Sequence, residues 1–202
     1  MKKKELEIIL QKIPSFKTPK PELEQYTTPA EIAADIIFTA HQFGDIENKK
    51  VLDLGCGTGI FSVGAFLTGA EKVVGIDADK NSIDIARNYA ERNNLNITYI
   101  VQDVKEVEIK SDTVIMNPPF GAQKSNIKAD RKFIEKGFEL ASVIYSLHLS
   151  KTVSFIDKMV TSLEGKIEYS KDYIFPLKSI YDFHEKKVVN FEVTLLRIFT
   201  KT

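Results

Sequence analysis

The chain has 202 residues, of which 28 are Lys or Arg and 28 are Asp or Glu, so its formal net charge is zero. This balance argues against a strongly basic nucleic-acid-binding protein. No apolar run approaches the roughly 18 residues that a membrane span requires, and the single cysteine, Cys56, permits no internal disulfide. We therefore expect one domain, residues 1–202, without a membrane span and in a reducing, cytoplasmic compartment.

The first residues predict a short helix followed by a stiff connection. Apolar residues recur there at helical spacing: Leu6, Ile9, Leu10 and Ile13. Residues 14–22 contain three prolines, which restrict the backbone. Thr28-Pro29-Ala30-Glu31 then matches a capping box with proline at the first helical position. We therefore expect Thr28 to cap the next helix.

Strands and helices alternate from residue 50 onward. Five strands are expected at Lys50–Leu54, Lys72–Asp77, Ile97–Val101, Thr113–Asn117 and Val143–Leu149. Helices are expected at residues 60–67, 80–93, 133–141 and 153–163. Two late runs, residues 166–175 and 188–200, have no helix between them and should form an antiparallel hairpin at one end of the sheet. The pattern predicts an α/β fold with a doubly wound, mostly parallel, seven-stranded Rossmann-like sheet and an N-terminal helical extension.

The segment Asn117-Pro118-Pro119-Phe120 directly follows an expected buried strand. Its prolines cannot continue a sheet ladder, so Asn117 is held at the carboxyl end of the strand, where open α/β sheets bind their ligands. The carbonyls of Asn117 and Pro118 can both accept hydrogen bonds from one exocyclic amine, and Phe120 offers a flat face to a base. These features suit a planar amine, although the segment alone could equally be turn punctuation.

A glycine-rich turn follows the first expected strand. Gly55, Gly57 and Gly59 alternate there and let the backbone approach a ligand closely. The third glycine comes one residue earlier than the dinucleotide fingerprint requires, which disfavours a nicotinamide cofactor. Asp77 ends the second strand about 20 residues later, where an acidic residue can bind ribose hydroxyls. Its alternative function is to cap the following helix.

These motifs together resemble class I S-adenosylmethionine-dependent methyltransferases of the amino-methylating type. Leu23–Thr28, Asn117–Gly121 and Tyr145–His148 further resemble the methyltransferase-like protein five family and its archaeal relatives, which methylate adenine N6 in small-subunit ribosomal RNA. The resemblance covers nearly the whole chain. The N-P-P-F motif is shared with DNA adenine methyltransferases, whereas the Q-Y-x-T and Y-S-L-H segments are more specific. The family often has proline where Thr27 stands.

The resemblance implies S-adenosylmethionine as cofactor and assigns residues to three groups. Residues 1–28 would form a helix and a cofactor lid, and residues 29–202 the catalytic core. Asp103 would contact the cofactor's adenine amine, with a turn cap as its alternative function. The expected cofactor contacts are Gln25, Thr28, Asp53, Gly55, Gly57, Gly59, Asp77 and Asp103. The expected catalytic residues are Asn117, Pro118, Pro119 and Phe120, and no metal site is expected.

RNA contacts are expected in the second half of the chain, where residues 121–202 hold 14 basic and 10 acidic residues. Residues 121–131 are expected to form a basic loop that either closes on substrate, with Gly121 as a hinge, or is an ordinary surface loop. The expected substrate-binding residues are Phe120, Lys124, Lys128, Arg131, His184, Lys186 and Lys187.

The expected strand Ile97–Val101 is an edge strand without charge or proline, and such edges can pair with another chain. The resembling family works with a small zinc-binding activator protein, so this edge is a candidate docking site and a lysine at Tyr99 should disrupt it. The alternative is an edge that is simply tolerated.

Other functions remain open at this point. They are a protein glutamine N5-methyltransferase, whose relatives usually carry Tyr in place of Phe120, a DNA adenine methyltransferase, and a non-catalytic cofactor-binding module.

Overall fold

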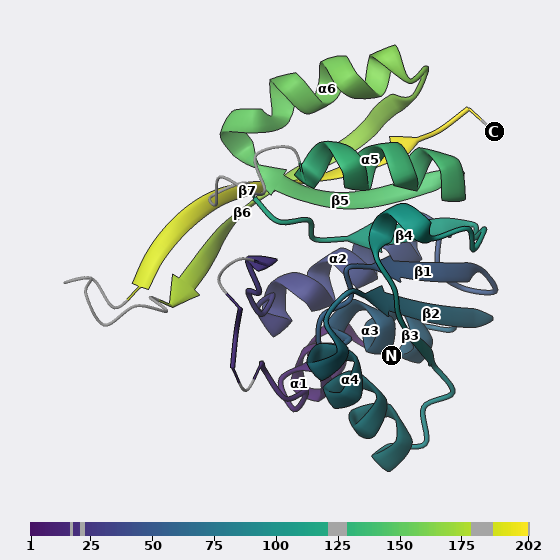
Figure 1. The fold of residues 1–202 in the computed structure, drawn as a ribbon, viewed down its shortest axis with the longest axis vertical. Helices are drawn as coiled ribbons and strands as arrows, with labels where there is room; N and C mark the ends of the chain where they lie inside the picture. Colours follow the sequence, from purple (N-terminus) through teal and green to yellow (C-terminus); the bar gives the residue numbers. More distant parts are fainter. Residues whose placement is uncertain (17, 21–22, 121–128, 179–187, 202) are drawn as a thin grey trace.

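The computed structural model describes residues 1–16, 18–20, 23–120, 129–178 and 188–201. It contains a seven-stranded sheet in the order β3-β2-β1-β4-β5-β7-β6 (Figure 1). Strands β1 to β5 pair in parallel, and β7 runs antiparallel to both β5 and β6. The strands are β1 Lys50–Leu54, β2 Lys72–Asp77, β3 Thr98–Val101, β4 Thr113–Met116, β5 Val143–Leu149, β6 Lys166–Lys178 and β7 Val188–Phe199. The predicted fold class and hairpin are confirmed.

Helices cover both faces of the sheet. The elements α1, α2 and α3 pack on one face with α4 beside them, whereas α5 and α6 pack on the other. The helices are α1 Lys3–Leu10, α2 Ala30–Gln42, α3 Ile60–Leu67, α4 Lys80–Arg92, α5 Ala129–Leu140 and α6 Val153–Ser162, with short 3-10 turns η2 Val104–Glu106 and η4 Ser150–Thr152. No helix among these described residues is both long and apolar enough to cross a bilayer.

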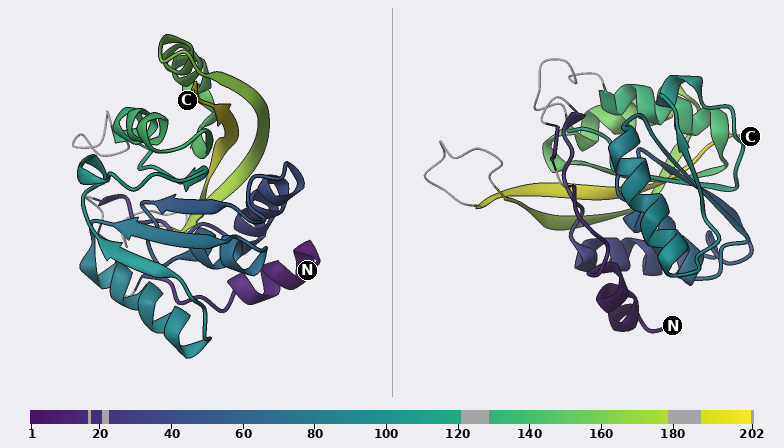
Figure 2. Two further views of the ribbon diagram at one scale, coloured as in Figure 1. Left: turned by 90° about the vertical axis from the view of Figure 1, so that its right-hand side faces the viewer. Right: turned by 60° about the horizontal axis from the view of Figure 1, so that its bottom comes forward.

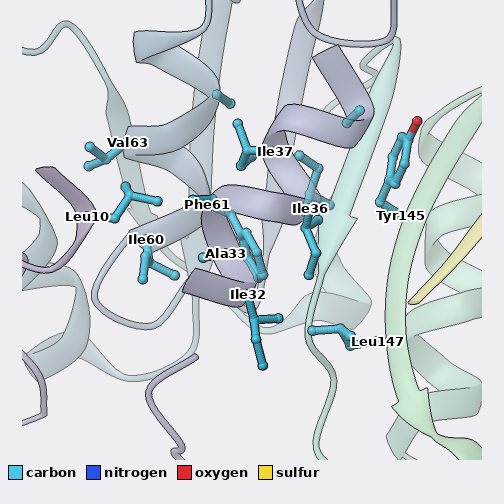
Figure 3. Close-up of a cluster of buried hydrophobic side chains, with 14 of the residues drawn as sticks. Leu10, Ile32, Ala33, Ile36, Ile37, Ile60, Phe61, Val63, Tyr145 and Leu147 are labelled. Atoms are coloured by element: carbon cyan, nitrogen blue, oxygen red, sulfur yellow. The ribbon is translucent and has the colours of Figure 1, made fainter. Parts of the chain in front are cut away.

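The largest apolar cluster lies between the sheet and the α1–α3 layer. Ile36 and Ile37 of α2 and Val63 of α3 are almost completely buried there (Figure 3). Gly64 lets these helices approach closely, because a Cβ at this position would lie 2.8 Å from Ile37 Cγ1. The cluster holds α2 and α3 against the sheet and thereby fixes the turn that precedes α3.

The hairpin of β6 and β7 is longer than predicted, since β6 continues to Lys178. It extends beyond the rest of the sheet (Figure 2). The two strands pair over their whole described length, from Lys166 opposite Phe199 to Lys178 opposite Val188, with one irregularity between Ile167 and Tyr169.

Two local predictions are wrong. Helix α2 begins at Ala30 with Pro29 in the N-cap position and no side-chain cap, so Thr28 does not form a capping box. Helix α5 begins at Ala129, so Arg131 belongs to a helix and not to the expected loop. The capping-box prediction failed because the Thr28 hydroxyl has a tertiary partner, described below. The remaining part of that loop, residues 121–128 with the hinge predicted at Gly121, lies outside the described residues.

Candidate active site

A cavity of about 290 Å³ lies at the carboxyl ends of β1, β2 and β4. This size is near the lower end of the range for small-molecule sites. The N-terminal segment before α2 closes one side of the cavity, and the glycine turn closes another. Residues predicted from the sequence that line it are Gln25, Thr28, Gly55, Gly57, Asp77, Asp103, Asn117 and Pro119. Lining residues that the prediction missed include Phe16, Glu24, Lys105, Lys132 and Phe133.

The glycine turn requires its glycines. Gly55, Gly57 and Gly59 have φ values of +75°, +53° and +89°, which are left-handed and strained for other residues. A Cβ at Gly55 would also come within 2.9 Å of the Phe133 ring. The backbone of Gly55 and Gly57 therefore lines the cavity without a Cβ, while Gly59 lies at the N-terminus of α3 and does not line it.

Asp53 does not line the cavity, but supports the glycine turn through the helix that follows it. Its Oδ2 accepts hydrogen bonds from the Ser62 backbone N–H at 2.8 Å and from the Ser62 hydroxyl at 2.6 Å. Its Oδ1 is buried and has no partner among the described residues. Burial raises the pKa of Asp53 to about 7, although the Ser62 bonds oppose this shift. Asp53 thus serves the first turn of α3, whose own N-cap residue, Gly59, has no side chain.

Asp77 lines the cavity and also holds the backbone around it. Its Oδ2 accepts from Gly57 N–H and its Oδ1 from Asp79 N–H, both at 2.8 Å. Burial raises its pKa, opposed by these backbone bonds. The alternative function considered for Asp77 is wrong, because the side chain that caps α4 is Asp79, through Ser82 N–H.

Asp79 also anchors the N-terminal segment. It accepts from Lys20 Nζ at 2.7 Å and from Gln25 Nε2 at 3.0 Å. Burial acts to raise the pKa of Asp79, but the bonds from Lys20, Ser82 and Gln25 lower it below its usual range. The sequence signal for Asp79 was its position directly before the helix that begins at Lys80, because Asp is a preferred N-cap residue. Gln25 therefore ties the segment to α4 across the cavity.

Asn117 lies directly after β4 and connects to the N-terminal segment. Its Nδ2 donates to Thr28 Oγ1 at 3.1 Å, across 89 positions of sequence. Its Oδ1 is buried and has no partner among the described residues. A buried amide oxygen without a partner is costly, so this atom is a candidate acceptor for a ligand donor.

Phe120 does not line the cavity. Its ring stacks on Tyr26, with centroids 6.5 Å apart and planes 18° from parallel. It also contacts the edge of Phe175, with centroids 5.9 Å apart and planes at 89°. Phe120 thus joins the N-terminal segment to strand β6.

Asp103 serves as a turn cap and also lies at the cavity. Its side chain accepts from Lys105 N–H at 2.9 Å and caps η2, while it also lines the cavity. Arg131 is exposed, ion-paired with Glu135 at 2.9 Å, and does not line the cavity. The other predicted RNA contacts, Lys124, Lys128, His184, Lys186 and Lys187, lie outside the described residues. Within the described ranges, no group of three or more His, Cys, Asp or Glu side chains could hold a metal ion.

Comparisons with known proteins place this geometry in a family. The family described as the methyltransferase small domain matches residues 33–142. The chain is 42% identical over 209 residues to the rRNA N(6)-adenosine-methyltransferase METTL5 of Danio rerio, and the match covers 100% of both proteins. The chain belongs to the METTL5 family. The predicted family resemblance is thereby confirmed.

Two further proteins match with similar coverage. The uncharacterized protein MJ0284 of Methanocaldococcus jannaschii is 39% identical over 210 residues, covering 98% of this chain and 94% of that protein. The crystal structure of PH1948 from Pyrococcus horikoshii has a TM-score of 0.92 at 36% identity, covering 100% of this chain and 99% of the other.

The Y-S-L-H segment that resembled the METTL5 family is structural here. Tyr145 donates to Asp45 Oδ2 at 2.5 Å, and Arg197 donates to the same oxygen at 2.7 Å. His148 is buried with its Nε2 2.7 Å from the Ser146 hydroxyl, and burial lowers its pKa to about 3. None of these residues lines the cavity. The segment therefore fixes β5 against β7 and against Asp45, which follows α2.

Strand β3 is an edge strand, as predicted. The prediction that a lysine at Tyr99 would disrupt only the pairing at this edge is wrong. Tyr99 is buried, and its hydroxyl lies 2.4 Å from where a Cβ on Gly59 would stand. A lysine there would disrupt the core below the glycine turn. The exposed positions of β3 are Thr98 and Val101.

Proposed function

We propose that this protein transfers a methyl group from S-adenosylmethionine to N6 of adenine in RNA, with small-subunit ribosomal RNA as its substrate. The observation that carries the proposal is Asn117, which lines the cavity beside the glycine turn and whose Oδ1 is buried without a partner among the described residues. The full-length similarity to METTL5 of Danio rerio, which is named an rRNA N(6)-adenosine-methyltransferase, supports this substrate.

The cavity fits the proposed cofactor. Gly55 and Gly57 leave backbone without a Cβ at the cavity wall, and the Asp77 carboxylate lies at the end of β2 for ribose hydroxyls. Asp103 lies at the end of β3 for an adenine amine. Gln25 and Thr28 would close the N-terminal segment, residues 1–28, over the catalytic core of residues 29–202. Asp53 and Gly59 would act by holding the turn.

The residues of the N-P-P-F motif would then position the target amine. Asn117 Oδ1 and the Pro118 carbonyl would each accept a hydrogen bond from one of its N–H groups, and this directs the nitrogen lone pair away from both acceptors. When bound, the cofactor supplies an already activated methyl group. The protein contributes alignment, which is a large effect for transfer between two reactants. Pro119 stiffens the motif, and Phe120 would offer a stacking face to the flipped base.

RNA binding would depend on the basic residues predicted from the sequence. Arg131 is exposed on α5, one residue before Lys132 at the cavity. Phosphate contacts release counterions, so binding should weaken as salt increases. We propose that Lys124, Lys128, Arg131, His184, Lys186 and Lys187 contribute, and that neutralising them reduces both affinity and salt dependence. Unchanged RNA affinity in that variant would contradict this part of the proposal.

The edge strand β3 is the proposed docking site of a small zinc-binding activator protein. Val101 is 45% exposed although apolar, and β3 has no neighbour beyond it in the described sheet. Val101→Lys should weaken the complex, whereas Lys110→Gln, outside the strand, should not. Equal capture of the activator by both variants would remove β3 from consideration. A cytoplasmic location, which suits a ribosomal RNA substrate, belongs to the same proposal.

The test of the main proposal is methyl transfer from labelled S-adenosylmethionine to four acceptors: small ribosomal subunits, RNA, DNA and a protein with a Gly-Gly-Gln loop. We expect label in RNA, recovered as N6-methyladenosine. Label in glutamine or only in DNA would support the corresponding alternative. Cofactor binding without transfer to any acceptor would indicate a non-catalytic module.

A further inference from the structure

The hydrogen bond between Thr28 and Asn117 assigns a function to Thr28 beyond lining the cofactor cavity. Thr28 is buried, with 5% of its surface exposed, and its Oγ1 is 3.1 Å from Asn117 Nδ2. We infer that Thr28 is a positioning residue, which sets the rotation of the Asn117 amide so that its oxygen faces the substrate. This inference rests on the proposed function, because it specifies how that site presents its acceptor.

The two faces of an asparagine amide are not equivalent for this reaction. Its oxygen accepts hydrogen bonds and its nitrogen donates them, while the χ2 torsion that exchanges the two is broad and roughly two-fold. A half-turn of Asn117 would place an NH₂ group opposite the target amine, so that two donors would meet. The amine would then lose an acceptor in a site with little water, where such a mismatch is costly.

The structure accounts for the orientation through Thr28. The bond to Thr28 Oγ1 occupies the amide nitrogen, and the oxygen remains buried without a partner among the described residues. Thr28 is available for this contact because it does not cap α2. Pro29 follows it with φ at −55°, and Pro118 follows Asn117, so both partners lie on restricted backbone.

The bond between Thr28 and Asn117 also differs from the other hydrogen bonds that hold the N-terminal segment. Gln25 bonds to Asp79 and Ser82, and thus holds the segment to α4 without touching Asn117. Thr28 bonds directly to Asn117, whereas Tyr26 of the same segment reaches the catalytic motif through its ring stacking on Phe120. A function restricted to the cofactor would therefore affect cofactor affinity, whereas a positioning function would affect the transfer step.

Two substitutions separate these possibilities. Thr28→Val preserves shape but removes the hydroxyl, and Thr28→Ser retains the hydroxyl. For each variant we would measure the dissociation constant of S-adenosylmethionine by calorimetry and kcat on RNA. We expect Thr28→Val to lower kcat roughly 3- to 10-fold, since one hydrogen bond contributes about that factor, with cofactor affinity within about twofold of wild type. Thr28→Ser should restore kcat.

A nuclear magnetic resonance measurement tests the contact without relying on activity. The side-chain NH₂ signals of Asn117 can be assigned by their loss in Asn117→Asp. We expect a nuclear Overhauser contact between these protons and the Thr28 methyl group in the wild-type protein. The signals should move in Thr28→Val and should stay in place in Thr27→Val, which removes the hydroxyl of the exposed neighbouring threonine.

The inference is overturned if the wild-type protein lacks that contact, whether or not the variants fold. It is also overturned if Thr28→Val keeps wild-type kcat, or if its only effect is weaker cofactor binding. Failure of the proposed function would look different: wild-type protein would then methylate no RNA, while the Asn117 signals would still report the presence or absence of the Thr28 bond.

Discussion

Replacing the buried carboxylate below the glycine turn should change how stability depends on pH. Burial raises the pKa of Asp53 from 3.8 to about 7. Between these values the folded protein retains a proton that the unfolded chain releases. Stability therefore falls as pH rises through this window and is fully present only below the unfolded pKa. Asp53→Asn removes the titration, while its amide oxygen can still accept from Ser62.

The magnitude follows from the two pKa values. Each pKa unit corresponds to about 1.4 kcal/mol, so a site that titrates near 3.8 unfolded and near 7 folded loses roughly 2–3 kcal/mol of stability between pH 5 and pH 8. The free energy of unfolding of Asp53→Asn, measured relative to wild type, should therefore increase by about this amount between pH 5 and pH 8.

Urea unfolding followed by circular dichroism at pH 5, 6, 7 and 8 would measure this difference. The comparison with the variant is necessary because other groups also titrate. Burial lowers the pKa of His148 to about 3, which makes stability rise with pH up to about 6.5, but this effect is common to both proteins. Ser62→Ala provides a control that removes a partner of Asp53 and leaves the carboxylate. Parallel stability curves for wild type and Asp53→Asn would refute the reasoning.

Three other substitutions test the site and its support. Asn117→Ala should abolish methyl transfer with little change in S-adenosylmethionine affinity, because Asn117 is proposed to touch the target amine; wild-type activity would remove it from the mechanism. Asp77→Ala should weaken cofactor binding by roughly 1.5–3 kcal/mol through loss of a charged acceptor, and an unchanged calorimetric dissociation constant would restrict Asp77 to holding Gly57. Arg197→Met should destabilise the fold by about 3–5 kcal/mol, because Asp45 would keep a buried charge without its partner, and an unchanged melting temperature would contradict this.

The sequence determined the fold class and identified several of the residues that line the cavity. Alternating apolar strands and helices predicted the seven strands and the antiparallel hairpin, because hydrophobic periodicity depends on local geometry. The glycine turn and Asp77 were also predictable, since left-handed backbone and an acidic strand end leave characteristic residues. The position of Asn117 at the end of β4 was predictable because the prolines that follow it cannot continue a sheet ladder.

Only the tertiary structure decided which side chains meet across the cavity. Thr28 was predicted to cap a helix, a local interaction, but its hydroxyl bonds to Asn117, 89 residues away. Likewise, Asp53 lies beneath the turn and not in the cavity, and Tyr99 is buried below Gly59 and not on the open edge. A polar side chain can form a hydrogen bond with a partner that is near or distant in sequence, and spacing along the chain does not show which partner it will have. The packing of α2 and α3 on the sheet decides the partner, because it brings particular side chains within hydrogen-bond distance.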